Sequence, residues 1–327
     1  MRKYVRFNYF EVQLIPAEAE VHEELGEEYN FHAAETWDMK SFLDYLMVRR
    51  NTFETTVSIG SEYSEVEKDS YVYDQQRDLY HFQLSKLRET NIPAKKKFGE
   101  IKQDILLNQD EFIGEFNSIV YDPVYGAVAI QSNFYGLTIK QTEQVLTELR
   151  FRYLHEIGES EEHPFTVKLA PIIDRSKIDR VANADYFKKI RIKGSDVMLD
   201  ANLGDDNLLS EARDILNESA GVNIDLSISL GRAERTASLD TENIIKVIEQ
   251  FKDIEVDERP QIELTALYNE DAEVEVVNLI EPRMTDRIAI EVEPRQTVGH
   301  EYLLQEFLVK YDERRPDVRR VLVPIGE

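Results

Sequence analysis

The stretch FNSIVYDPVYGAVAIQSNFYGLTIKQTEQVLTEL, residues 116–149, decides the fold, because it joins a hairpin to a helix without a break. Its two apolar runs, 119–121 and 127–131, predict strands, and the connector DPVYG between them has the proline and glycine of a hairpin turn. Thr138 has the side chain of a helix N-cap, and apolar residues follow at helical spacing as far as Leu149. An antiparallel hairpin followed by a helix indicates an α+β fold.

A polar patch, Gln131, Ser132 and Asn133, lies at the exit of the second strand. Amides and hydroxyls at such a place either satisfy the backbone of a turn or contact a ligand. The turn is the favoured interpretation, since Asn and Ser routinely bind their own loop backbone.

The rest of the chain shows the same mixture of strands and helices. The charged, aperiodic stretch 158–164 predicts a linker. We therefore expect two domains, 1–157 and 165–327, each a mainly antiparallel sheet with helices packed on it. In the second domain we expect strands at 165–173, 186–194, 222–231 and 287–294, a hairpin at 260–282, and helices at 208–221, 240–253 and 300–322, the last interrupted or bent by Pro316.

The composition narrows the class of protein. Among 327 residues, 39 Lys and Arg oppose 64 Asp and Glu, which gives a formal net charge of −25. This charge repels nucleic acid at long range and favours solubility or a basic partner. The absence of cysteine excludes disulfides, thiolate metal sites and cysteine nucleophiles. Because no apolar run could span a bilayer and the first residues alternate like a strand, we expect a cytoplasmic protein without membrane insertion.

No catalytic motif stands out in the sequence. A phosphate-binding glycine loop, a serine nucleophile elbow and paired metal-binding histidines are all missing. Glu291 and Glu293 share a strand face and, with Glu281 and Asp286, resemble a metal-dependent nuclease site. Such a site also needs a lysine to stabilise charge, and none follows at the expected place. We therefore predict no catalytic residues, metal ligands or cofactor, while an enzymatic activity stays open.

A basic segment stands out against the acidic chain. Between Phe165 and Lys193, eight Lys and Arg face only three Asp, and Tyr186 and Phe187 are placed to stack on bases. The alternative is a network of internal ion pairs with neighbouring acidic loops. The arginines within 314–320 are attributed to the C-terminal dipole of the closing helix. The predicted nucleic-acid-binding residues are Lys168, Lys177, Arg180, Lys188, Lys189, Arg191, Lys193, Arg232 and Arg235.

Two blocks of the sequence carry a family resemblance. Residues 106–146 contain, in this order, a strand, a turn, a strand with a polar end and a helix. Residues 262–311 contain a strand, an acidic turn, a strand and a helix that carries a tyrosine. In this order the chain resembles the RexA-type exclusion proteins of temperate phages. The layout is also similar to that of Kiwa-type defence proteins of the KwaB kind.

The resemblance implies a two-domain, dimeric, non-enzymatic protein of phage exclusion, with nucleic-acid binding and abortive infection as its activities. The leading hypothesis is therefore an antiphage defence protein that contacts DNA or RNA through the basic segment. One alternative is an acidic regulatory subunit that docks a partner defence effector or a phage protein. A further alternative is a metal-dependent nuclease.

Overall fold

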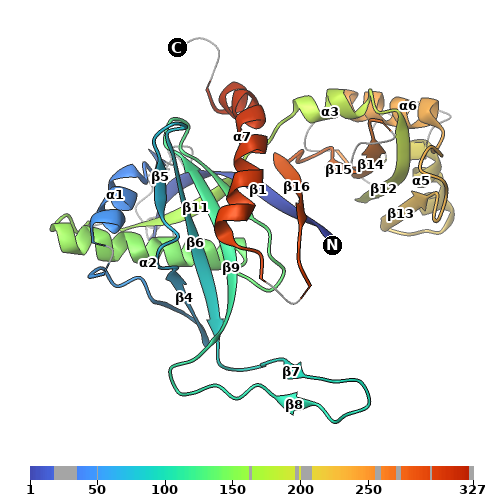
Figure 1. The fold of residues 1–327 in the computed structure, drawn as a ribbon. Helices are drawn as coiled ribbons and strands as arrows, with labels where there is room; N and C mark the ends of the chain where they lie inside the picture. Colours follow the sequence, from blue (N-terminus) through green and yellow to red (C-terminus); the bar gives the residue numbers. More distant parts are fainter. Residues whose placement is uncertain are drawn as a thin grey trace. The chain divides into compact units, whose positions relative to one another are not determined.

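The computed structural model describes residues 1–17, 35–49, 51–161, 164–195, 199, 208–254, 259–269, 274–294 and 297–323. Its contacts divide the chain into two compact units (Figure 1). Unit 1 comprises Met1–Ile172 together with Thr285–Glu327, and unit 2 comprises Ile173–Met284. Both contain antiparallel strands and helices, so the predicted α+β class is confirmed. None of the described helices combines the length and the apolar character needed to cross a membrane.

Unit 1 is built on a ten-stranded antiparallel sheet whose main path runs β11-β1-β10-β9-β6-β4-β3. The predicted hairpin is confirmed as β9 and β10, which pair from Ile119↔Ile130 to Asp122↔Ala127. Gly126 closes the turn with φ +59°, a conformation that glycine adopts without strain. The strands are β1 Arg2–Pro16, β2 Glu35–Thr36, β3 Val57–Ile59, β4 Glu62–Val66, β5 Val72–Asp74, β6 Leu79–Arg88, β9 Ile113–Asp122, β10 Ala127–Gln131, β11 Phe165–Pro171 and β16 Thr285–Glu291.

The long strand β1 organises this sheet. One edge of β1 pairs with β10, along residues 7–11. The other edge pairs with β16 along residues 2–8 and with β11 along residues 10–16. β11 and β16 therefore lie end to end on one edge of β1, although 113 residues separate them in the chain.

This pairing corrects the expected domain boundary at 158–164. β11 leaves β1 at Pro171, opposite Phe10, and β16 joins β1 at Thr285, opposite Asn8. Unit 2 is thus inserted between two strands that share one edge, and 165–327 do not form a separate domain. The physical reason is long-range hydrogen bonding, which a change of composition along the chain does not reveal.

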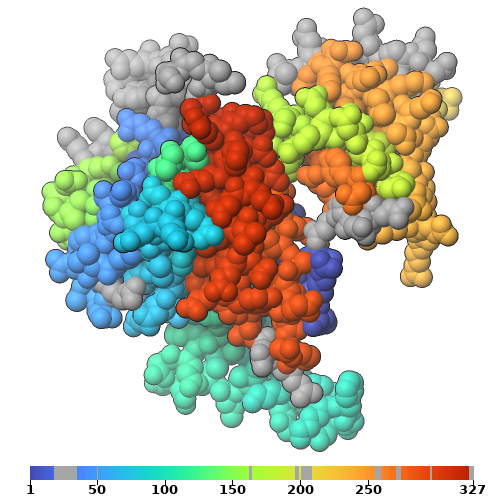
Figure 2. All heavy atoms as spheres, turned by 45° about the horizontal axis from the view of Figure 1, so that its top comes forward, coloured from blue at the N-terminus to red at the C-terminus, as the bar shows by residue number. Residues whose placement is uncertain are grey.

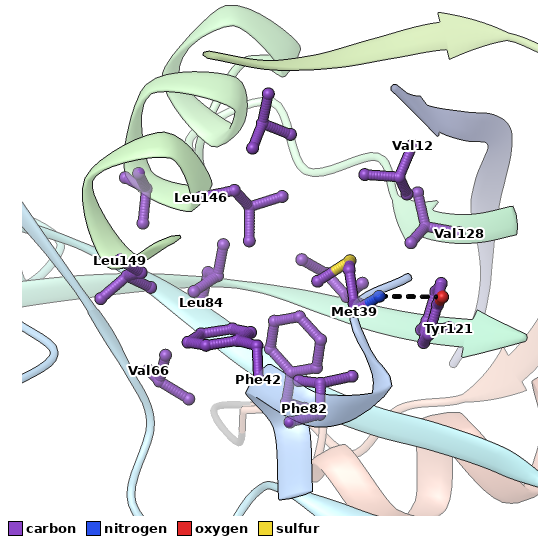
Figure 3. Packing of buried hydrophobic residues seen from close by; sticks show 14 of the residues in the cluster. Val12, Met39, Phe42, Val66, Phe82, Leu84, Tyr121, Val128, Leu146 and Leu149 are labelled. Atoms are coloured by element: carbon purple, nitrogen blue, oxygen red, sulfur yellow. Dashed lines mark hydrogen bonds between the residues drawn. The ribbon is translucent and has the colours of Figure 1, made fainter. Parts of the chain in front are cut away.

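Helices α1, Lys40–Val48, and α2, Ile139–Ile157, cover one face of this sheet and enclose the main apolar core of unit 1 (Figure 3). Thr138 caps α2 as predicted, and Gln141 completes a capping box by binding back to the Thr138 backbone. In the same core the hydroxyl of Tyr121 accepts a hydrogen bond of 3.0 Å from the backbone of Met39. The core residues drawn in Figure 3 include Val12, Phe42, Phe82, Leu84, Val128, Leu146 and Leu149.

Helix α7, His300–Leu322, covers part of the opposite face. The ring of Phe307 stacks on that of Phe7 of β1 with centroids 3.7 Å apart. Of the two effects predicted for Pro316, an interruption or a bend, the interruption is wrong, because α7 continues through Pro316. Unit 1 therefore has three layers, with the sheet between α1 and α2 on one side and α7 on the other.

Unit 2 is a four-stranded antiparallel sheet in the order β13-β12-β14-β15. Apolar residues of its strands and helices share a second core, which includes Phe187, Ile192 and Phe251. Asp240 caps α6 as its sequence position predicts, by accepting a hydrogen bond from the backbone of Asn243. The elements are α3 Ser176–Val181, β12 Tyr186–Ser195, α5 Leu208–Glu218, β13 Asn223–Ser229, α6 Thr241–Asp253, β14 Gln261–Leu267 and β15 Glu275–Asn278.

Candidate nucleic-acid interface

Six of the predicted cations lie on β12 and on the loop that follows β13. Strand alternation places Lys189, Arg191 and Lys193 on one face of β12, while Ile190 and Ile192 point into the core. Residues two apart on a strand are about 6.6 Å apart, so these cations form an evenly spaced row. We call the set the basic ribbon; its members are Lys188, Lys189, Arg191, Lys193, Arg232 and Arg235.

The row faces polar side chains of the neighbouring strands. In the register of the sheet, Lys189 lies opposite Ser229 of β13 and Thr265 of β14. Arg191 lies opposite Ser227 and Glu263. This side of the sheet therefore combines cations with hydroxyl groups, which is a combination that binds phosphate oxygens.

Two carboxylates, those of Asp225 and Glu263, compete for these cations. Asp225 lies 2.6 Å from the Arg191 guanidinium and 3.5 Å from the Lys193 ammonium. The hydrogen bond from Arg191 lowers the pKa of Asp225 to about 2, with a smaller contribution from Lys193. All three side chains are more than a third exposed. Ion pairs of this kind contribute little free energy in water, so a phosphate group can replace Asp225 at modest cost.

Lys188 occupies a β-bulge and points to another part of the ribbon. The pairing of β12 with β14 shifts register between Phe187 and Lys189, which turns Lys188 toward the loop after β13. There its ammonium donates to the backbone carbonyls of Arg235 and Ala237 and lies 5.1 Å from the Tyr186 ring. Lys188 thus fixes the loop that carries Arg232 and Arg235, both of which are exposed.

The three other predicted residues are not part of this cluster. Lys168 belongs to unit 1 and pairs with Glu143 at 3.2 Å. Lys177 is 3% exposed and pairs with Glu275 at 3.0 Å, and Arg180 pairs at 2.7 Å with the fully buried Asp174. For these residues the structure shows the internal ion pairs that the sequence left as the alternative.

The acidic residues considered for a metal are likewise separated. Glu291 lies 3.4 Å from the N-terminal ammonium of Met1, whereas Asp286 is buried and bound by Arg314. Within the described part of the chain, no three acidic or histidine side chains gather as a metal site. The geometry of these residues gives no support to the nuclease alternative.

Sequence reasoning missed two parallel triads beneath α7. The hydroxyl of Tyr9 donates to Asp286 at 2.7 Å, and Arg314 donates to the same carboxylate from two nitrogens, at 2.7 and 3.0 Å. In the second triad, Tyr311 donates to Asp122 at 2.7 Å, and Arg315 lies 2.8 Å from that carboxylate. The rings of Tyr9 and Tyr311 are stacked with centroids 6.1 Å apart.

Burial governs the chemistry of these triads. Burial raises the pKa of Tyr9 and of Tyr311 well above the usual value, and the adjacent carboxylates add to the effect. Burial alone would lower the pKa of Arg314, but the hydrogen bond and the charge of Asp286 raise it. The tyrosines thus remain neutral donors between fixed charges, an arrangement that attaches α7 to the sheet. The sequence places Asp122 in a turn and attributes the arginines to a helix dipole, so only the three-dimensional pairing shows this role.

The structure also brings together two histidines that are far apart in the sequence, His81 and His300. The rings of His81 and His300 lie 5.8 Å apart, at the start of α7. His300 Nε2 faces the Ser70 carbonyl at 3.2 Å, so this nitrogen carries the proton and Nδ1 accepts from the Ser118 hydroxyl at 2.9 Å. Burial lowers the pKa of both rings, and the charge of His81 helps to bring that of His300 to about 4. Ser118 is fully buried, and among the described residues no carboxylate hydrogen-bonds to the His300 ring. His300 and Ser118 therefore position α7 rather than acting as a base and its nucleophile.

The polar patch at 131–133 closes the end of the β9–β10 hairpin. The Gln131 side chain accepts from the backbone of Ser118 at 3.0 Å, and Asn133 donates to the carbonyl of Phe116 at 3.1 Å. Asn117 donates back to the carbonyl of Gln131 at 2.9 Å. The patch therefore satisfies backbone groups, as the turn interpretation predicts.

The chain belongs to a family of unknown function (DUF6731), whose model matches residues 1–320. The matched range includes both units and the basic ribbon. No curated protein matches the chain. The family description assigns no activity.

Proposed function

We propose that this protein acts by binding rather than by catalysis, as a cytoplasmic phage-exclusion or antiphage defence protein that contacts nucleic acid through the basic ribbon. The defence role rests on the resemblance of residues 106–146 and 262–311 to RexA-type proteins. The cytoplasmic location is supported by the absence of cysteine.

The observation that supports nucleic-acid contact is the row of Lys189, Arg191 and Lys193 on one face of β12. Its spacing of about 6.6 Å is close to the distance between successive phosphates of an extended single strand, so each cation can meet one phosphate. Ser227 and Ser229 stand beside the row as additional donors. This set contacts the phosphate backbone of a nucleic acid. The expected stacking of Phe187 on bases is wrong, because that ring is fully buried in the core of unit 2.

The net charge of −25 imposes a condition on such binding. At physiological ionic strength the Debye length is about 8 Å, so a phosphate in contact with the ribbon interacts mainly with nearby charges. The acidic remainder of the chain still opposes long-range attraction. We therefore expect weak, strongly salt-dependent binding that favours flexible single strands over stiff duplexes.

A gel shift with a triple charge reversal tests the proposal. Lys189→Glu, Arg191→Glu and Lys193→Glu together should abolish retention of single-stranded DNA or RNA at low salt, because three phosphate contacts become repulsive. The matched control reverses three exposed cations of unit 1, Lys40, Lys140 and Arg319, and so makes the same change in net charge. The control should retain the nucleic acid.

Two outcomes would contradict the proposal. A parent protein that retains neither DNA nor RNA at low salt has no nucleic-acid interface. If the ribbon variant and the control lose retention of nucleic acid equally, the binding depends on net charge rather than on the ribbon.

A further inference from the structure

A hairpin arm projects from the sheet of unit 1 between β6 and β9. The arm, residues 89–112, contains β7, Ala94–Lys95, and β8, Gln103–Asp104. These strands pair only with each other, through Ala94↔Asp104 and Lys95↔Gln103. In Figure 1 the arm extends away from the remainder of the sheet, and the space-filling view of Figure 2 shows the same projection.

The arm presents large apolar side chains to solvent. Phe98 is fully exposed, Ile101 is 86% exposed and Leu106 is 89% exposed. An isolated two-stranded hairpin is marginally stable in water, and contiguous exposed apolar residues commonly mark an interaction surface. A partner that covers these residues would stabilise the arm as well as bind it.

The tip of the arm is also basic. Residues 94–102 contain four lysines and one glutamate, so they carry +3 and leave −28 on the rest of the chain. The chain turns between Lys97 and Glu100, where Gly99 has φ +78°. Phe98 lies in this turn between Lys97 and Lys102, and Lys95 and Lys96 precede the turn.

Charge complementarity points to a second copy of this chain as the partner. Two arms carry like charges at their tips and repel each other, whereas an arm and the acidic body of another copy attract. The apolar residues favour a protein surface over a phosphate backbone. We propose that the arm of one protomer packs along α2 of a second protomer, and that the two arms are exchanged symmetrically.

Helix α2 offers a surface of matching chemistry. Two adjoining grooves of about 610 and 580 Å³ follow it and share Arg152 in their walls. Apolar side chains line both, including Val57 and Val167 in one groove and Phe151 and Leu154 in the other. Of the glutamates in their walls, Glu143, Glu148 and Glu161 pair with Lys168, Arg152 and Arg150, whereas Glu156, which accepts from the Tyr45 hydroxyl, is exposed. The exposed Glu159 follows the helix.

The two chemical features of the arm match these grooves. Phe98 and Ile101 have apolar walls to contact, and the exposed Glu156 and Glu159 offer carboxylates to the lysines on the same surface. A reciprocal exchange makes the same contact twice and closes a two-fold dimer, so it does not propagate into fibres. This inference is independent of nucleic-acid binding, because the arm and α2 both belong to unit 1.

A charge-swap experiment tests the arrangement. The arm variant carries Lys95→Glu, Lys96→Glu and Lys97→Glu, and the helix variant carries Glu148→Lys, Glu156→Lys and Glu159→Lys. Sedimentation velocity should show a dimer for the parent and a monomer for each variant alone. An equimolar mixture should form a heterodimer, because each of its two interfaces then joins opposite charges.

The mixture also controls for misfolding, because two unfolded variants would not restore dimer formation when they are mixed. Phe98→Ser should weaken dimerisation at least tenfold as an apolar anchor is lost, whereas Val48→Ser, at an exposed position of α1, should not. A monomeric parent, dimeric single variants or a monomeric mixture would each overturn the proposal. So would a monomeric parent whose arm instead binds vesicles of anionic lipid.

Discussion

Replacing Arg314 with methionine should destabilise unit 1 strongly. The substitution keeps an unbranched apolar stem but removes the guanidinium that binds Asp286 at 2.7 and 3.0 Å. Asp286 is 5% exposed, so among the described residues its carboxylate would keep only the Tyr9 hydroxyl as a buried partner. Removing one member of a buried pair costs about 3–5 kcal/mol, because an uncompensated charge remains.

Urea unfolding followed by fluorescence measures this loss. Trp37 is the only tryptophan and lies in the core of unit 1, so its emission reports on the unfolding of that unit. A loss of about 3–5 kcal/mol corresponds to a fall of about 1–2 M in the urea midpoint for a unit of this size. The control is Arg319→Met, an exposed position on α7 that should change stability by less than about 0.5 kcal/mol.

A double variant separates the charge from the packing. Asp286→Leu with Arg314→Met removes both charges and leaves the Tyr9 hydroxyl without its acceptor, which costs about 1–3 kcal/mol. The double variant should therefore be more stable than Arg314→Met alone. The reasoning would be refuted if Arg314→Met cost no more than Arg319→Met, or if the two substitutions simply added.

Three further predictions concern local features of unit 1. The pKa of His300 is lowered to about 4 from an unfolded value of 6.5, so its contribution to stability is complete above pH 6.5 and is lost as the pH falls toward 4. After allowance for partial exposure, denaturation at each pH should show a loss of about 1–2 kcal/mol across this window that is absent in His300→Asn. Gly126→Ala should cost about 1–2 kcal/mol in urea unfolding, because the residue has φ +59° and the new Cβ would lie 2.4 Å from Thr36 Cγ2. Thr138→Ala should cost about 1 kcal/mol in the same assay, through loss of the N-cap of α2, whereas Thr138→Ser should cost less.

The parts of the fold that depend on local pattern could be predicted. The β9–β10 hairpin follows from period-two spacing around DPVYG, and the start of α2 follows from the side chain of Thr138. Both signals lie within a few residues of the structure they specify. The long-range pairing of β1 with β11 and β16 has no such signal, and the domain boundary was misplaced for that reason.

In the candidate site, too, the features that depend on local pattern could be predicted and those that depend on long-range pairing could not. Lys189, Arg191 and Lys193 share a face because one strand carries them, and the sequence alone indicates this. Lys177 has the same charge and looked equivalent, yet Glu275 and burial remove it from the surface. Charge can be read from the sequence, whereas the partner of each charge depends on the tertiary structure.

The salt dependence of single-strand binding tests the central claim most directly. For each phosphate contact that is lost, the slope of log K against log salt concentration should fall in magnitude by about 0.7. The variant with Lys189→Gln, Arg191→Gln and Lys193→Gln should therefore show a slope smaller by about 2 than the parent, with weaker binding at every salt concentration. An unchanged slope, or a parent that does not bind at low salt, would contradict the account.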